Sequence, residues 1–90
     1  MSPTRSKDIP GLDLHGMTPD AAIVAVERFV NRQFASRARE VMIVHGRGQG
    51  KLKAQVQKCL SQSPLVKRHF GGLPSEGSDG VTIAVLEDHA

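Results

Sequence analysis

Apolar residues recur along the chain with two different spacings, and the spacing predicts which element each segment forms. In residues 11–15, Leu12 and Leu14 alternate with polar neighbours, which is typical of a short strand with one buried face. Residues 41–44, VMIV, are apolar at every position, as expected for an interior, parallel strand. Two more strands are predicted at residues 66–70 and 81–87.

Two other segments follow the three-and-four spacing of a helix with one buried side. The first, residues 19–36, has Thr18 as its N-cap and Pro19 at its first helical position. Its apolar stripe consists of Ala22, Ile23, Val26, Phe29, Val30 and Phe34. The second helix is predicted over residues 50–62. Its stripe consists of Leu52, Val56, Cys59 and Leu60.

The predicted order of elements is therefore β-α-β-α-β-β. Strand–helix–strand units join parallel strands by right-handed crossovers, and the last two strands are close enough in sequence to pair antiparallel. The sequence thus predicts a two-layer α/β sandwich, with a mixed four-stranded sheet and two helices on one face. Residues 11–88 are expected to form this domain, with residues 1–10 as a flexible tail or linker and residues 71–80 as a loop.

Composition limits the setting in which this domain works. Its 90 residues suffice for one domain, and 39% hydrophobic with 23% charged residues is typical of a soluble globular chain. No apolar run could span a membrane, and residues 1–11 contain no signal-peptide stretch. The single cysteine, Cys59, falls at an apolar helical position, so we expect a core thiol and a reducing, cytoplasmic location without membrane association.

The net charge of +3 is unevenly distributed. No acidic residue lies between Glu40 and Glu76. The cations of that segment are Arg47, Lys51, Lys53, Lys58, Lys67 and Arg68. Uncompensated positive charge attracts polyanions, which favours a nucleic acid as partner. An ordinary solvated basic face has the same composition.

The first predicted strand ends in a carboxylate and an imidazole. Because successive strand side chains point to opposite faces, Asp13 and His15 share the face opposite the two leucines. The pair suits a working histidine whose tautomer or pKa is set by an aspartate. It also suits a solvated aspartate followed by a histidine that only caps the next turn.

A second His-Gly segment follows the strand at residues 41–44. In HGRGQGK, residues 45–51, the glycines let the backbone turn tightly, and the start of the next helix favours a phosphate. The spacing is neither that of a P-loop nor that of the dinucleotide fingerprint. We therefore expect a turn that holds a backbone phosphate, although an ordinary connection between a strand and a helix gives the same pattern.

Both His-Gly segments are expected at the carboxyl edge of the sheet, where open α/β sheets place their sites. Two imidazoles, an aspartate and a basic glycine-rich turn are the parts of a phosphodiesterase, in which one imidazole acts as base and another as acid. The candidate catalytic residues are Asp13, His15 and His45. The candidate nucleic-acid-binding residues are Gly46, Arg47, Gly48, Gly50, Lys51, Lys53, Lys58 and Arg68.

A divalent metal such as Mg²⁺ or Mn²⁺ is a weaker alternative. Asp13, His15 and His45 could supply three ligands, but no closely spaced cluster specifies a metal. The requirement depends on the substrate. A metal-free mechanism with two histidines needs a ribose 2′-OH and acts on RNA, whereas nicking DNA needs an activated water and favours a metal.

Three segments resemble the motifs of the Smr domain, the small MutS-related domain: LDLHG at residues 12–16, HGRG at 45–48 and GVTIAVL at 80–86. The resemblance covers residues 11–87. It implies an α/β sandwich similar to the C-terminal domain of bacterial translation initiation factor three. It also implies an endonuclease that nicks DNA or cleaves RNA, including messenger RNA on collided ribosomes, and a link to DNA repair through a MutS paralogue that suppresses recombination.

We therefore expect a structure-directed endonuclease that acts on branched or structured DNA or RNA. The alternative is a module that binds nucleic acid or the ribosome with the same basic surface but does not cleave. A protein-interaction domain is a third class, which no specific feature supports. Aromatic residues make up only 3% of the chain, so we expect backbone contacts with strong salt dependence rather than base stacking.

Overall fold

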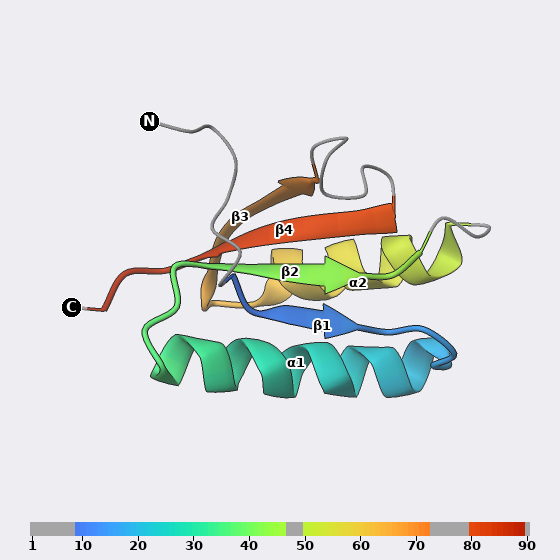
Figure 1. Cartoon of the computed structure of the whole chain (residues 1–90), viewed down its shortest axis with the longest axis horizontal. Coiled ribbons are helices and arrows are strands. Elements are labelled where there is room, and N and C mark those ends of the chain that lie inside the picture. The colour runs from blue at the N-terminus through green and yellow to red at the C-terminus, as the bar shows by residue number, and fades with distance from the viewer. Residues whose placement is uncertain (1–8, 47–49, 73–79, 90) are drawn as a thin grey trace.

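The described residues of the chain form four strands and two helices in the predicted order (Figure 1). The computed structural model describes residues 9–46, 50–72 and 80–89. The elements are β1 (Gly11–Asp13), α1 (Pro19–Ala35), β2 (Glu40–Val44), α2 (Lys51–Gln62), β3 (Val66–Gly71) and β4 (Val81–Leu86). Most of the predicted tail and most of the predicted loop, residues 1–8 and 73–79, lie outside the described residues.

The four strands form one mixed sheet in the order β1-β2-β4-β3. β1 and β2 are parallel, while β4 is antiparallel to both β2 and β3. The last strand in sequence is thus inserted between β2 and β3, where it has a partner on each edge. This position explains its apolar sequence, VTIAVL, of which five residues are buried and the other, Val85, is half-buried.

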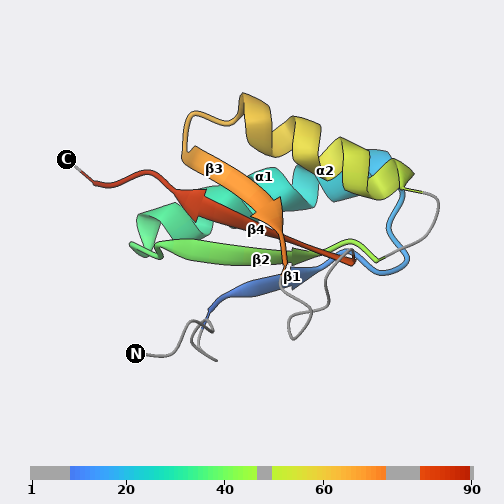
Figure 2. The ribbon, with the colours of Figure 1, turned by 90° about the horizontal axis from the view of Figure 1, so that it is seen from above.

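Both helices cover the same face of the sheet, as Figure 2 shows. Their apolar stripes and one face of the strands make the core, which consists of Leu14, Ala22, Val26, Phe29, Val30, Val41, Ile43, Val56, Leu60, Ala84 and Leu86. The predicted two-layer α/β architecture, with a mixed four-stranded sheet, is confirmed.

The predicted element boundaries shift where side chains cap the backbone. The first strand ends at Asp13 rather than at His15, because the Asp13 carboxylate accepts the His15 N–H and starts a turn. Thr18 is the predicted N-cap of α1, and its Oγ1 accepts the Ala21 N–H at 3.2 Å. The second helix begins one residue later than predicted, since Gly50 is its N-cap.

Cys59 lies on α2 and packs against the core, as expected of a structural thiol. It also lines a groove of about 710 Å³ between α1 and α2, together with Glu27. Partial burial, and secondarily the negative charge of Glu27, raise the pKa of the Cys59 thiol above its ordinary value. The thiol is therefore protonated and weakly reactive near neutral pH.

Both ends of the described chain lie at the same end of the sheet. Ile9 and Pro10, before β1, share a cavity of about 1040 Å³ with Glu87 and His89, after β4. His89 is held there by stacking on Phe34 of α1, with ring centroids 4.1 Å apart. The strands β1 and β2 run away from this end, so their carboxyl ends lie at the other (Figure 1). Neither helix in the described part of the chain is long and apolar enough to cross a membrane.

Substitution of Leu60 by alanine tests the core. Leu60 is only 1% exposed, so Leu60→Ala should lower the free energy of unfolding by about 2–5 kcal/mol through lost burial and the cavity that remains. Val24→Ala is the matched control, because Val24 is exposed and its loss should change stability by less than ~0.5 kcal/mol. Urea denaturation measures both values, and equal losses would contradict the assigned core.

Candidate active site

The two His-Gly segments leave neighbouring strands at the same edge of the sheet. β1 and β2 are parallel, and Asp13 lies opposite Val44, the last residue of β2. The Leu14 N–H donates to the Val44 carbonyl at 2.9 Å, which extends the pairing one residue beyond β1. His15 and His45 therefore emerge at one edge, as the sequence predicts.

His15 lies on a short turn that is fixed on both sides. The Oδ1 atom of Asp13 accepts the His15 N–H at 2.9 Å, and the Met17 N–H donates to the Leu14 carbonyl at 3.0 Å. Gly16, at φ 78°, supplies the left-handed backbone conformation that the turn requires. Because Leu14 is fully buried, the turn is anchored directly in the core.

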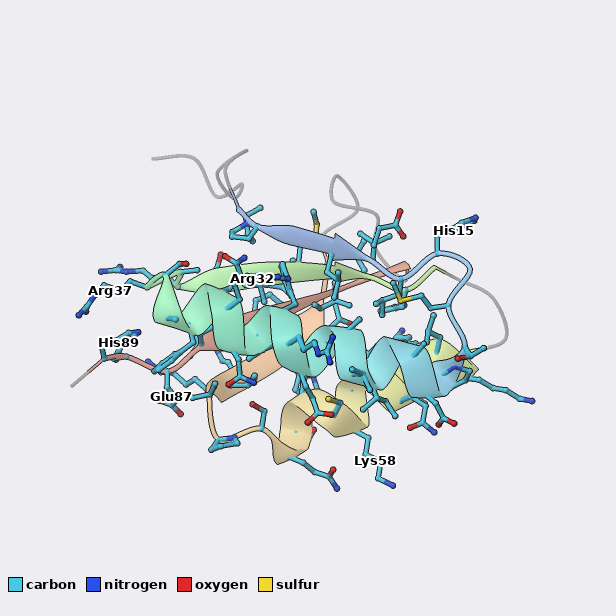
Figure 3. The ribbon with its side chains drawn as sticks, turned by 90° about the horizontal axis from the view of Figure 1, so that it is seen from below. His15, Arg32, Arg37, Lys58, Glu87 and His89 are labelled. Atoms are coloured by element: carbon cyan, nitrogen blue, oxygen red, sulfur yellow. The ribbon has the colours of Figure 1, made fainter. Side chains whose placement is uncertain are left out.

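The imidazole of His15 is exposed and makes no hydrogen bond, ion pair or ring contact with the residues that the structure describes. Figure 3 shows it pointing outward from the turn. Both ring nitrogens are therefore accessible to a substrate. The Asp13 carboxylate contacts the backbone of His15 and not its ring, so it holds the turn and does not set the tautomer.

His45 has the opposite environment. The residue is 7% exposed, with Nδ1 at 2.9 Å from the Gly46 carbonyl and Nε2 at 2.8 Å from Thr82 Oγ1. A carbonyl can only accept, so Nδ1 carries the hydrogen of the first bond. In the neutral ring, Nε2 then accepts the hydroxyl hydrogen of Thr82. Both nitrogens of His45 are thus engaged inside the protein.

Gly80, the residue before β4, also holds the backbone that follows β2. The Gly80 carbonyl accepts the N–H groups of both His45 and Gly46, each at 3.0 Å. Gly46 has a φ of 80°, which turns the chain sharply at this point. Sequence reasoning gave no role to Gly80 or Thr82. The available signal was a hydroxyl in an otherwise apolar strand, and Thr82 is fully buried.

The first turn of α2 has no side-chain cap. Gly50 is the N-cap at φ 83°, and the first bond within the helix runs from the Ala54 N–H to the Gly50 carbonyl. The N–H groups of residues 51–53 therefore have no partner within the helix. The helix dipole adds partial positive charge to this end, and Lys51 and Lys53 add full charges.

Several predicted binding residues meet at a cavity of about 310 Å³. Its lining includes Gly46, Gly50, Lys51 and Lys53, together with His45. It also includes Met17, Pro19 and Leu52, for which the sequence suggested no such role. Arg47 and Gly48 lie outside the described residues.

Two predicted binding residues lie elsewhere. Lys58 is seven residues beyond Lys51 on α2, about 10 Å further along the axis, where it lines the groove between the helices (Figure 3). Arg68 pairs with Val85, which pairs with Glu40 at the start of β2. That row is four residues, about 13 Å, from the edge at Val44. The structure therefore does not bring Lys58 or Arg68 to this site.

The alternative of a three-ligand metal centre does not fit this geometry. Within residues 9–46, 50–72 and 80–89, no group of three or more His, Cys, Asp or Glu side chains could hold a metal ion. Asp13, His15 and His45 are all among these residues, so they do not form such a set.

Comparison with known proteins places the chain in a family. The model of the Smr domain matches residues 12–87. The chain belongs to the Smr domain family. This Smr domain is 42% identical over 77 residues to "Endonuclease MutS2" of Caldanaerobacter subterraneus subsp. tengcongensis and 39% identical over 77 residues to that of Caldicellulosiruptor saccharolyticus. Each match covers 86% of this chain and 10% of the relative, so the chain spans about a tenth of the length of these relatives.

Solved structures agree with this assignment. The Smr domain of Thermus thermophilus MutS2 superposes with a TM-score of 0.86 at 26% identity, covering 88% of this chain and 99% of that one. YdaL, a stand-alone small MutS-related protein from Escherichia coli, superposes with a TM-score of 0.81 at 24% identity, covering 87% of this chain and 64% of that one. The second likeness shows the fold alone.

Substitution of Thr82 by valine tests the link between β4 and His45. Valine matches threonine in shape but leaves His45 Nε2 unpaired in a buried position, so Thr82→Val should lower the free energy of unfolding by about 1–3 kcal/mol. Thr82→Ser keeps the hydroxyl, so its free energy of unfolding should be closer to that of the unchanged protein. Chemical denaturation measures both. A Thr82→Val variant as stable as the parent would show that the hydrogen bond contributes nothing.

Proposed function

We propose that this Smr domain is an endonuclease that cleaves nucleic-acid backbones, with His15 as the acid–base group at the phosphate. The observation that carries the proposal is the accessible imidazole of His15, held on a rigid turn. The matched relatives are named endonucleases, which supports the same chemistry here. A branched or ribosome-bound substrate, a role in DNA repair and recombination, and a cytoplasmic location stay predictions from the sequence.

The start of α2 supports binding of a polyanion. Lys51 and Lys53 form no ion pair with any residue that the structure describes, and the N–H groups of the same turn have no helical partner. A phosphate placed there receives charge from two ammonium groups and the helix end. Binding through such contacts weakens steeply as salt concentration rises.

We assign different roles to the two histidines. The imidazole of His15 reaches solvent, so it can exchange a proton with a substrate. The hydrogen bonds of His45 to Gly46 and Thr82 support a positioning role, because both of its nitrogens are already occupied. Asp13 is likewise a positioning residue, which fixes the turn through the His15 N–H.

One free imidazole supports cleavage of RNA most directly. Its neutral nitrogen removes the proton of a ribose 2′-OH, and the resulting oxygen attacks the adjacent phosphorus. The bond from phosphorus to the 5′-oxygen breaks, and that oxygen takes a proton from the imidazolium or from water. The products are a 2′,3′-cyclic phosphate and a 5′-hydroxyl. Lys51 and Lys53 would stabilise charge on the phosphate as it develops.

Substitution of His15 tests this mechanism. His15→Ala should lower kcat on single-stranded RNA by about 10²–10⁴-fold, the usual contribution of a general acid or base, with thermal unfolding and RNA affinity retained. His69→Ala is the matched control, since His69 lies on β3 and bonds Ser61. End-group analysis of the fragments identifies the chemistry. Full activity of His15→Ala would overturn the assignment, and binding without any cleavage would support the non-cleaving module.

A pair of Asp13 variants separates two roles of the carboxylate. Asp13→Asn keeps an oxygen that accepts the His15 N–H, so it should retain most of the cleavage rate. Asp13→Ala removes the acceptor and should lower the cleavage rate further. The loss should be about tenfold if ~1.4 kcal/mol of turn stabilisation is lost. Single-turnover rates measure the difference. Equal loss in both variants would show that the negative charge is required.

A further inference from the structure

The cavity of about 310 Å³ beside the His15 turn has walls of two kinds. Met17, Pro19 and Leu52 give it apolar surface, and Lys51 and Lys53 give it positive charge. Its volume is near the lower limit of about 300–1,000 Å³ for ligand sites, which suits a ligand the size of one nucleoside.

Met17 connects this cavity to the candidate catalytic group. It closes the turn that carries His15, since its N–H donates to the Leu14 carbonyl. Its backbone is therefore fixed, yet the residue is 38% exposed, a large apolar residue that the core does not bury. A thioether is flexible and polarizable and packs well on the face or edge of a flat ring.

Apart from the two lysines, the described side chains of the cavity wall have little capacity to read hydrogen-bonding patterns. Among the described residues that line it, none carries a carboxylate, side-chain amide or hydroxyl. Both nitrogens of His45 are engaged by Gly46 and Thr82, and the lysine side chains only donate. A flat ring next to a phosphate fits these walls. If the two lysines contact the phosphate, no other described side chain is left to distinguish one base from another.

We propose that this cavity binds one unpaired nucleobase adjacent to the phosphate that is cleaved, without preference for a particular base. The proposal rests on the proposed endonuclease function and specifies its substrate. A base within a duplex must first leave its stacked neighbours and its partner, which is easier for an unpaired nucleotide. The substrate is therefore single-stranded at the point of cleavage. Apolar contact with Met17 takes the place of aromatic stacking.

The first experiment measures binding without cleavage. The cleaved position in a single-stranded RNA is mapped with the unchanged domain. An oligonucleotide with 2′-deoxyribose at that position and 2-aminopurine in the flanking nucleotide is then titrated. Fluorescence should rise because the base leaves its stacked neighbours. Met17→Ala should weaken binding about fivefold and reduce the rise, through lost apolar contact. Val24→Ala, which removes an exposed apolar side chain outside the cavity, should behave like the unchanged domain.

The second experiment measures cleavage. Replacing the flanking nucleotide by an abasic one should lower kcat/KM for the unchanged domain by about fivefold, and should have little effect on Met17→Ala. Substrates with each of the four bases at that position should be cleaved at similar rates, and a full duplex should resist cleavage. Thermal unfolding confirms that each variant is folded.

The outcomes separate the two proposals. If the unchanged domain neither binds nor cleaves RNA, the endonuclease function fails. If it cleaves RNA, but Met17→Ala, the abasic substrate and the duplex are all cleaved at the normal rate, the base site fails and the endonuclease function stands.

Discussion

One carbonyl just before β4 and one hydroxyl on β4 hold the end of β2 in place. The Gly80 carbonyl accepts two N–H groups, and the Thr82 hydroxyl meets the ring of His45 in the interior. Buried polar groups are costly to leave unpaired, so these bonds hold His45 and Gly46, the residues that follow β2, in one position. This position matters for the candidate site, because His45 and Gly46 line the same cavity as Lys51 and Lys53. Because the Leu14 N–H bonds the last residue of β2, the His15 turn depends on the same anchor.

The two His-Gly segments look alike in sequence but differ in environment. His15 follows a strand at the sheet margin, and a single aspartate ends that strand and lifts the imidazole into solvent. His45 follows an interior strand, next to β4, and its ring turns inward to a hydroxyl. The position of each strand in the sheet, rather than the local motif, explains why one imidazole is free and the other is engaged.

The element order and the shared edge could be predicted because they depend on hydrophobic spacing and on the parallel pairing of strand–helix–strand units. The insertion of β4 between β2 and β3 could not, since an antiparallel pair at the sheet margin has the same local pattern. The number of positive charges in the sequence also does not show on which part of the surface each charge lies. Lys58 shares a helix with Lys51 but lies two turns away, and Arg68 belongs to the row of Glu40 at the far end. Thr82 was missed because its partner is 37 residues distant.

Both ends of the described chain lie opposite the edge that carries His15, beside one shared cavity at Ile9 and His89. The described chain therefore enters and leaves the fold on the side opposite the candidate site. Under the proposed function, a substrate strand approaches the His15 imidazole from the side away from Ile9 and His89.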